Sequence, residues 1–143
     1  MKYRILSIVL VIAIFSATFL TATASTGVTP RYNNTSSTTT NFGISASGKA
    51  SIGAGYSAYR DYFEAATVTS YIEKRTLGIF WTKVDIGMPN NEWVDTSTEY
   101  VDSFGHEIYL NSTGTYRATV VYEISGTGGA TDVIEYEQER TYS

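Results

Sequence analysis

The sequence contains no cysteine and only one histidine among its 143 residues. Without cysteine, the chain has no disulfide, no thiolate metal site and no cysteine nucleophile. Zinc and copper sites usually recruit several histidine or cysteine ligands, which a single histidine does not supply. We therefore expect no metal and no other cofactor, and a core that is held together by packing alone.

Positive charge is also scarce, because 10 lysines and arginines stand against 14 aspartates and glutamates. The net charge is −4, and it becomes −6 if Lys2 and Arg4 are removed with an N-terminal leader. Electrostatic binding to nucleic acid or to anionic lipid needs clustered lysine and arginine. We expect no nucleic-acid partner and no membrane association of the processed chain, and the oligomeric state stays open.

The one long apolar run lies at the N-terminus. Lys2 and Arg4 precede an apolar stretch over 5–20, and Ala22-Thr23-Ala24 follows the small-x-small cleavage rule. This pattern predicts a signal peptide over 1–24, cleaved before Ser25, and hence a secreted, extracellular protein. The alternative is a retained anchor helix, but the uninterrupted run is shorter than the roughly 20 residues that span a bilayer.

Two further regions follow. Residues 25–41 are rich in serine, threonine and asparagine, and such a stretch buries too little apolar surface to offset its ordering entropy. We predict a flexible leader over 25–41 and one domain over 42–143. Within the domain, apolar residues alternate with a period of two, which is typical of strands. The predicted strands are 42–46, 50–56, 67–75, 79–86, 93–101, 107–111, 115–125 and 133–142.

Short strands joined by glycine-rich turns predict an all-β fold, a two-sheet antiparallel sandwich. Residues 112–118 read STGTYRA and resemble the corner that precedes strand F of immunoglobulin-like domains. The resemblance implies that Tyr116, two residues after Gly114, donates its hydroxyl to upstream backbone. It also implies that Ala118 takes a half-cystine position and that Trp81 is the core tryptophan. Neither cysteine of that family is present.

The layout of the chain also resembles uncharacterised small exported proteins of Gram-positive bacteria. The shared features are a signal peptide, a Ser/Thr-rich leader, Glu73-Lys74 ahead of Trp81, and Gly114-Thr115-Tyr116-Arg117 near the end. This resemblance implies no known activity.

Candidate catalytic groups are few. His106 lies in a Gly-His-Glu sequence that we interpret as a solvated loop. Asp102 and Ser103 are its neighbours in sequence, but a catalytic triad depends on proximity in space, and no nucleophile motif is present. Glycosidases need two carboxylates across a cleft. The candidates, which we interpret as solvated surface, are Glu92, Asp95, Glu99, Glu123, Glu135 and Glu137.

A calcium site is the remaining alternative, since carboxylate and amide oxygens gather in one loop. The residues are Asp85, Asn90, Asn91, Glu92 and Asp95, and without EF-hand spacing we interpret them as a polar turn. We predict that the protein is not an enzyme and has no catalytic residue.

Tyrosine is enriched, with eleven of the twelve after residue 24, beside two tryptophans. Tyrosine combines apolar area with a polar tip and suits recognition surfaces. The candidate binding surface comprises Tyr56, Tyr59, Tyr62, Phe63 and Trp93, although aromatic residues also fill strand faces. The leading hypothesis is a secreted, non-enzymatic protein that recognises a protein or an extracellular glycan. The alternatives are an antibacterial or toxin-like effector and, third, a small secreted hydrolase.

Overall fold

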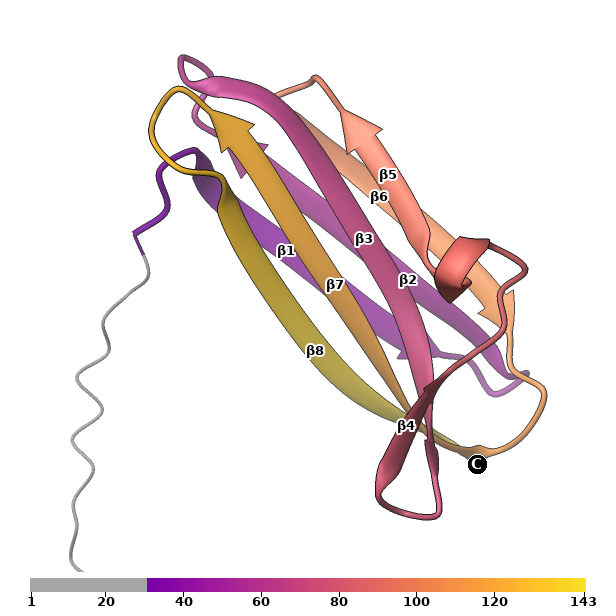
Figure 1. Cartoon of the computed structure of the whole chain (residues 1–143). Coiled ribbons are helices and arrows are strands. Elements are labelled where there is room, and N and C mark those ends of the chain that lie inside the picture. Colours follow the sequence, from indigo (N-terminus) through magenta and orange to yellow (C-terminus); the bar gives the residue numbers. More distant parts are fainter. Residues whose placement is uncertain (1–30) are drawn as a thin grey trace, which may run out of the picture. The chain divides into compact units, whose positions relative to one another are not determined.

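The computed structural model describes residues 31–143, which form two antiparallel β-sheets packed face to face (Figure 1). The strands are β1 (Thr35–Ile44), β2 (Lys49–Ala58), β3 (Phe63–Thr76), β4 (Phe80–Lys83), β5 (Trp93–Ser97), β6 (Val101–Tyr109), β7 (Gly114–Gly126) and β8 (Asp132–Tyr142), with a 3₁₀ turn at Pro89–Asn91. The predicted signal peptide and residues 25–30 lie outside the described residues. Within 31–143, no helix is long and apolar enough to cross a membrane.

One sheet has the order β1-β2-β6 and the other the order β4-β3-β7-β8. The strand β5 also pairs with β3, through Ala66–Ser70, whereas β4 pairs with Glu73–Thr76. Both short strands fit because β3 has 14 residues. Every pairing is antiparallel, so the predicted all-β, two-sheet sandwich is confirmed.

The core follows the two-residue period of the sequence. On β2, alternate side chains are buried, while glycines and serines occupy the other face. On β7, the buried apolar side chains are Tyr116, Ala118, Val120, Tyr122 and Ile124. These two strands belong to different sheets, and their apolar faces form one continuous interior. Burial of apolar surface therefore holds the sandwich together without a covalent link.

The strand β1 begins at Thr35, inside the segment that the composition assigns to a flexible leader. The buried carboxylate of Asp132 explains the difference. It accepts hydrogen bonds from the backbone N–H groups of Asn33, Asn34 and Thr35 at 2.9, 2.7 and 2.8 Å, and from the Thr35 hydroxyl at 2.9 Å. Burial raises the pKa of Asp132, but these hydrogen bonds outweigh it and hold the pKa below its usual value.

The corner before β7 has the predicted hydrogen bond. The Tyr116 hydroxyl donates to the carbonyl oxygen of Ser112 at 2.5 Å, and the Tyr116 side chain is buried. Gly114 starts the strand with a φ of 146°, a conformation that residues with a Cβ rarely adopt. Ala118 is buried in the core.

The prediction of a loop around His106 is wrong. His106 lies within β6, and Phe104, His106 and Ile108 share the side of the strand that faces the interior. The strand predicted over 93–101 is likewise split, because β5 ends at Ser97 and β6 begins at Val101. The short polar break between them carries too little sequence signal to be recognised.

Candidate functional site

Two exposed tyrosines stand on the connection between β2 and β3. The Tyr59 carbonyl accepts hydrogen bonds from the N–H groups of Tyr62 and Phe63, both at 3.0 Å, and closes a tight turn. The side chains of Tyr59 and Tyr62 are 46% and 49% exposed. Their rings meet edge to face, with centroids 6.4 Å apart. Both residues lie beyond the end of β2, where no opposing sheet covers them.

These tyrosines line an open groove of about 650 Å³. The opposite wall is the connection between β7 and β8, and the Thr127 N–H donates to the Tyr62 carbonyl at 2.8 Å to join the two connections. The lining residues are Arg31, Tyr32, Asn33, Tyr59, Tyr62, Thr127 and Gly128. The groove therefore offers aromatic rings, a guanidinium and an amide to one ligand.

A fully buried asparagine holds together the three segments that line the groove, which are residues 31–33, the β2–β3 connection and the β7–β8 connection. Asn34 donates its side-chain amide to the Ala130 carbonyl at 3.0 Å and accepts a hydrogen bond from the Gly128 N–H at 3.1 Å. Its own carbonyl accepts the N–H of Tyr59 at 2.8 Å. Because one residue fixes all three segments, the groove is formed before a ligand arrives, which reduces the entropic cost of binding.

Tyr56 and Phe63 do not belong to this surface, which corrects the prediction for both. Tyr56 is 4% exposed and donates its hydroxyl to the Glu99 carbonyl at 2.6 Å. Burial raises the pKa of this phenol. Phe63 is half-buried and stacks on Tyr56 with centroids 6.0 Å apart. Tyr56 follows the inward-facing alternation of β2, whereas Phe63 turns inward beside an irregularity in the register at the start of β3.

Trp93 is also not part of the groove. It lies on β5 and stacks on His106 of β6, with ring centroids 4.9 Å apart and planes 1° from parallel. The Nε2 atom of His106 lies 2.6 Å from Oδ2 of Asp95. The cluster joins the two sheets at one edge. Within residues 31–143, the imidazole hydrogen-bonds Asp95 and no serine or threonine hydroxyl.

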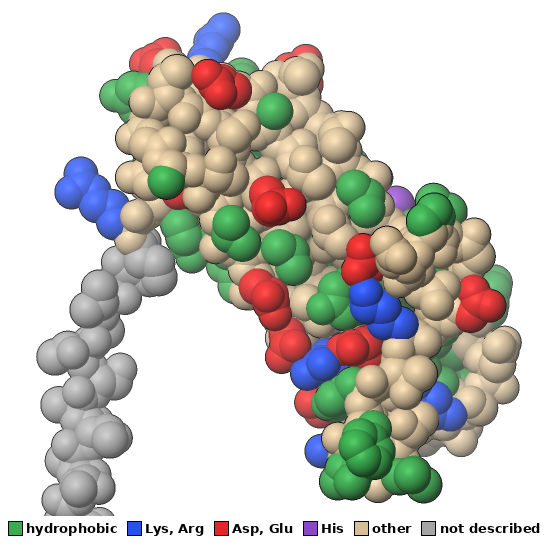
Figure 2. All heavy atoms as spheres, viewed as in Figure 1, with side chains coloured by type: hydrophobic (Ala, Val, Ile, Leu, Met, Phe, Trp, Pro, Cys, Tyr) green, Lys and Arg blue, Asp and Glu red, His purple; other side chains and the backbone are tan. Residues whose placement is uncertain are grey.

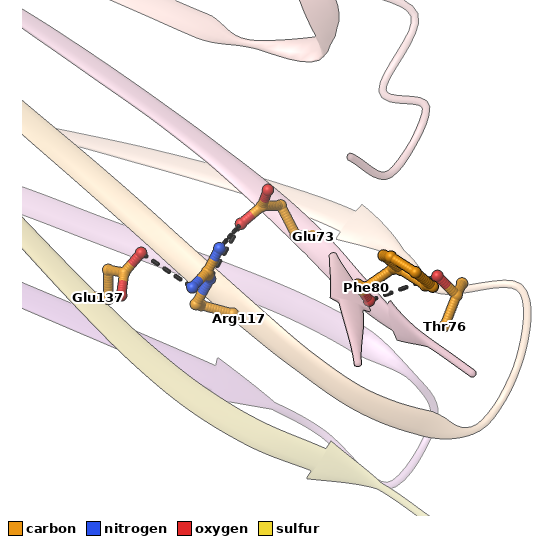
Figure 3. A network of polar contacts seen from close by, with 5 residues as sticks. All are labelled: Glu73, Thr76, Phe80, Arg117 and Glu137. Carbon is orange, nitrogen blue, oxygen red and sulfur yellow. Dashed lines mark hydrogen bonds and ion pairs between the residues drawn. The ribbon is translucent and has the colours of Figure 1, made fainter. Parts of the chain in front are cut away.

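Trp81 lies on the outer face of its sheet, so its prediction as a core tryptophan is wrong. Its ring centroid is 4.5 Å from Cζ of Arg117. Arg117 in turn bonds Glu73 through Nε and Nη2 at 2.9 and 2.6 Å, and Glu137 through Nη1 at 3.1 Å (Figure 3). Burial lowers the pKa of Arg117, but the hydrogen bond and charge of Glu73, together with the charge of Glu137, outweigh it and raise the pKa.

Comparison with family models, with curated protein sequences and with solved structures finds no match. The function is therefore inferred from the geometry of the site itself.

In the polar turn that is the alternative calcium site, the oxygen atoms of several candidate ligands accept hydrogen bonds or form an ion pair within the protein. Asp85 accepts the N–H of Gly87 at 2.9 Å, and Asn91 accepts the N–H of Ile86 at 3.3 Å. Glu92 pairs with Lys83. Across the described part of the chain, no three histidine, cysteine, aspartate or glutamate side chains lie close enough together to hold an ion.

Several groove residues have no clear signal in the sequence. Arg31, Tyr32, Asn33 and Asn34 fall in the stretch read as a flexible leader, and only the isolated aromatic ring of Tyr32 distinguishes it. Their partners, Thr127 and Gly128, lie about 95 residues further along, in a turn predicted from its glycines.

Proposed function

We propose that this chain is a secreted, non-enzymatic recognition domain whose Tyr59–Tyr62 groove binds an extracellular glycan. One observation carries the proposal: two exposed, mutually packed tyrosines form the wall of a groove that also holds Arg31 and Asn33. Aromatic faces pack against the apolar C–H face of a sugar ring, while amide and guanidinium groups donate hydrogen bonds to its hydroxyls.

The dimensions of the groove favour a glycan over a protein partner. A stable protein interface buries roughly 800 Å² on each side. The site here is concave, about 650 Å³ in volume, and confined between two connections. That volume lies within the range of about 300–1,000 Å³ typical of small-ligand sites.

We further propose that the sandwich is immunoglobulin-like. The sheets β1-β2-β6 and β4-β3-β7-β8 correspond in order to strands A-B-E and C′-C-F-G of that architecture. The Tyr116 hydrogen bond at the start of β7 then occupies the expected corner. In this correspondence the groove lies between the B–C and F–G loops, the end that variable domains use for binding.

A glycan array tests the function directly. We expect the chain to bind a subset of glycans, and Tyr59→Ala or Tyr62→Ala to weaken that binding roughly 30-fold, since an aromatic hot spot contributes about 2 kcal/mol. The matched control is Tyr109→Ala, which removes a tyrosine that is 66% exposed on β6. An array with no bound glycan, or binding that survives both groove substitutions, contradicts the proposal.

A further inference from the structure

The hairpin formed by β3 and β4 has an apolar tip. Leu77, Ile79 and Phe80 are 89%, 71% and 57% exposed. In Figure 1 the hairpin projects past the ends of the neighbouring strands, and Figure 2 shows a gathering of hydrophobic side chains at that end of the molecule. Large apolar side chains that cover no part of the interior mark an interaction surface when they lie together.

The turn itself is unusual for its sequence. The Ile79 N–H donates to the Thr76 carbonyl at 3.2 Å, and Leu77 and Gly78 between them have φ values of 51° and 74°. Asparagine and glycine are the residues that adopt such turns readily, whereas leucine there costs roughly 1 kcal/mol or more. The strained leucine contributes almost nothing to packing, because 89% of it is exposed. Its side chain is therefore presented outward.

Positive charge lies directly behind the apolar tip. Residues 74–83 contain three cations and no carboxylate, in a chain whose net charge is −4. Lys83 pairs with Glu92, but within residues 31–143 neither Lys74 nor Arg75 forms an ion pair. The Arg75 guanidinium lies 5.5 Å from the ring centroid of Trp81, which is partly exposed. The segment thus combines apolar, aromatic and cationic side chains in that order from the tip.

The composition of the whole chain predicts no membrane association, but the local arrangement of this hairpin differs from that average, and we propose that it docks the protein on an anionic lipid bilayer. Leu77, Ile79 and Phe80 enter the interface between headgroups and acyl chains, and the exposed Arg75 contacts the phosphates of the headgroups, whereas the Lys74 ammonium bonds Ser112 and adds only its charge. Apolar insertion and attraction to anionic lipid add together in interfacial binding. Three side chains on a convex tip cannot supply the roughly 800 Å² that a protein partner requires, whereas a bilayer closes around a protruding tip.

This surface is separate from the glycan groove. The groove lies before Phe63 and the hairpin tip follows Thr76, at opposite ends of the 14-residue strand β3. A strand of that length spans about 45 Å. Failure of either proposal therefore leaves the other intact, because each is tested by substitutions that do not touch the other end.

The absence of cysteine allows a direct test on the full chain. Leu77→Cys introduces a single thiol, which is labelled with a fluorophore whose emission shifts to the blue in an apolar environment. The matched control is Val133→Cys, at a position that is 62% exposed on β8. The two proteins share every other residue, so any contribution from the rest of the chain is equal in both.

With phosphatidylglycerol vesicles we expect a blue shift at position 77 and none at 133, and a much weaker shift with phosphatidylcholine vesicles. Adding Ile79→Ser and Phe80→Ser should remove the shift while the melting temperature stays unchanged. Arg75→Gln should weaken binding to phosphatidylglycerol roughly fivefold, the effect of one cation at an anionic surface.

Three outcomes would overturn the proposal. The first is the absence of a shift at position 77 with phosphatidylglycerol, or an equal shift at 133. The second is a shift that survives the serine substitutions. The third is a shift that grows with protein concentration without vesicles, which would assign the tip to a second copy of the chain.

Discussion

At the scale of single residues, two buried polar side chains decide where the domain begins. Asp132 and Asn34 each bond to segments more than 80 residues away, so both act only after the chain has folded. The carboxylate of Asp132 gathers three backbone N–H groups and a hydroxyl, of which those of Asn34 and Thr35 belong to buried residues and would otherwise lack partners. These contacts order a segment whose composition alone predicts flexibility.

We expect Asp132→Asn to reduce the free energy of unfolding by about 2–4 kcal/mol. The amide keeps one acceptor oxygen but turns an NH₂ group toward the N–H donors of Asn33–Thr35, and bonds to a charged group contribute about 1.5–3 kcal/mol. Urea unfolding measures the loss. Glu135→Gln, an exposed change on the same strand, is the control and should stay within about 0.5 kcal/mol. Equal effects of the two substitutions would contradict this role.

The carboxylate of Asp132 should also make the free energy of unfolding depend on pH. Its folded pKa lies below the ordinary value of 3.8, so its contribution is complete above that value and is lost as the pH falls through the folded pKa. We expect the stability difference between wild type and Asp132→Asn to shrink below about pH 4. Urea titrations at pH 7 and at pH 2–3 measure it, and a difference that stays constant would count against the mechanism.

At the scale of elements, the predictable strands are those whose apolar residues alternate without interruption. β2 and β7 were found in this way, because every second side chain in each is buried. The break between β5 and β6 and the middle of β6 were not, because the inward faces of these strands carry Trp93, Asp95 and His106, which satisfy one another only across the two sheets. The sequence does not reveal such a partnership between strands.

Tryptophan illustrates the same limit. The residue type predicts burial of a large ring but not which face of a strand carries it. Trp81 covers Arg117 on the outer face, and Trp93 bridges β5 and β6. The sequence predicts the reverse, with Trp81 in the core and Trp93 on the binding surface.

The bridge between β5 and β6 can be tested by truncation. Trp93→Ala removes the ring that stacks on His106 and should cost about 2–3 kcal/mol, somewhat below the range for a fully buried tryptophan. Chemical unfolding measures the change. Val94→Ala, at a neighbouring side chain that is 57% exposed, should cost far less. If the two substitutions cost the same, Trp93 does not join the sheets.

At the scale of the whole molecule, the two sheets pack into one body, and the two proposed recognition surfaces lie at its ends. The strands β3 and β7 pair along most of their length and run between those ends. Period-two alternation sufficed to predict the body. The ends depend on contacts between distant segments and on a turn whose strained leucine has no sequence rule, so only Tyr59 and Tyr62 were found in advance.

Amide hydrogen exchange of the full chain, followed residue by residue, tests most directly the distinction between the packed sheets and the ends of the molecule. We expect the slowest exchange in β2, in β7 and in Ala66–Ile72 of β3, whose side chains form the core. Exchange should be fast at Leu77 and Gly78 and around Arg60 and Asp61. Uniformly fast exchange in β3 and β7, or protection at the ends equal to that of these strands, would contradict a rigid cysteine-free body that carries its proposed recognition surfaces at its ends.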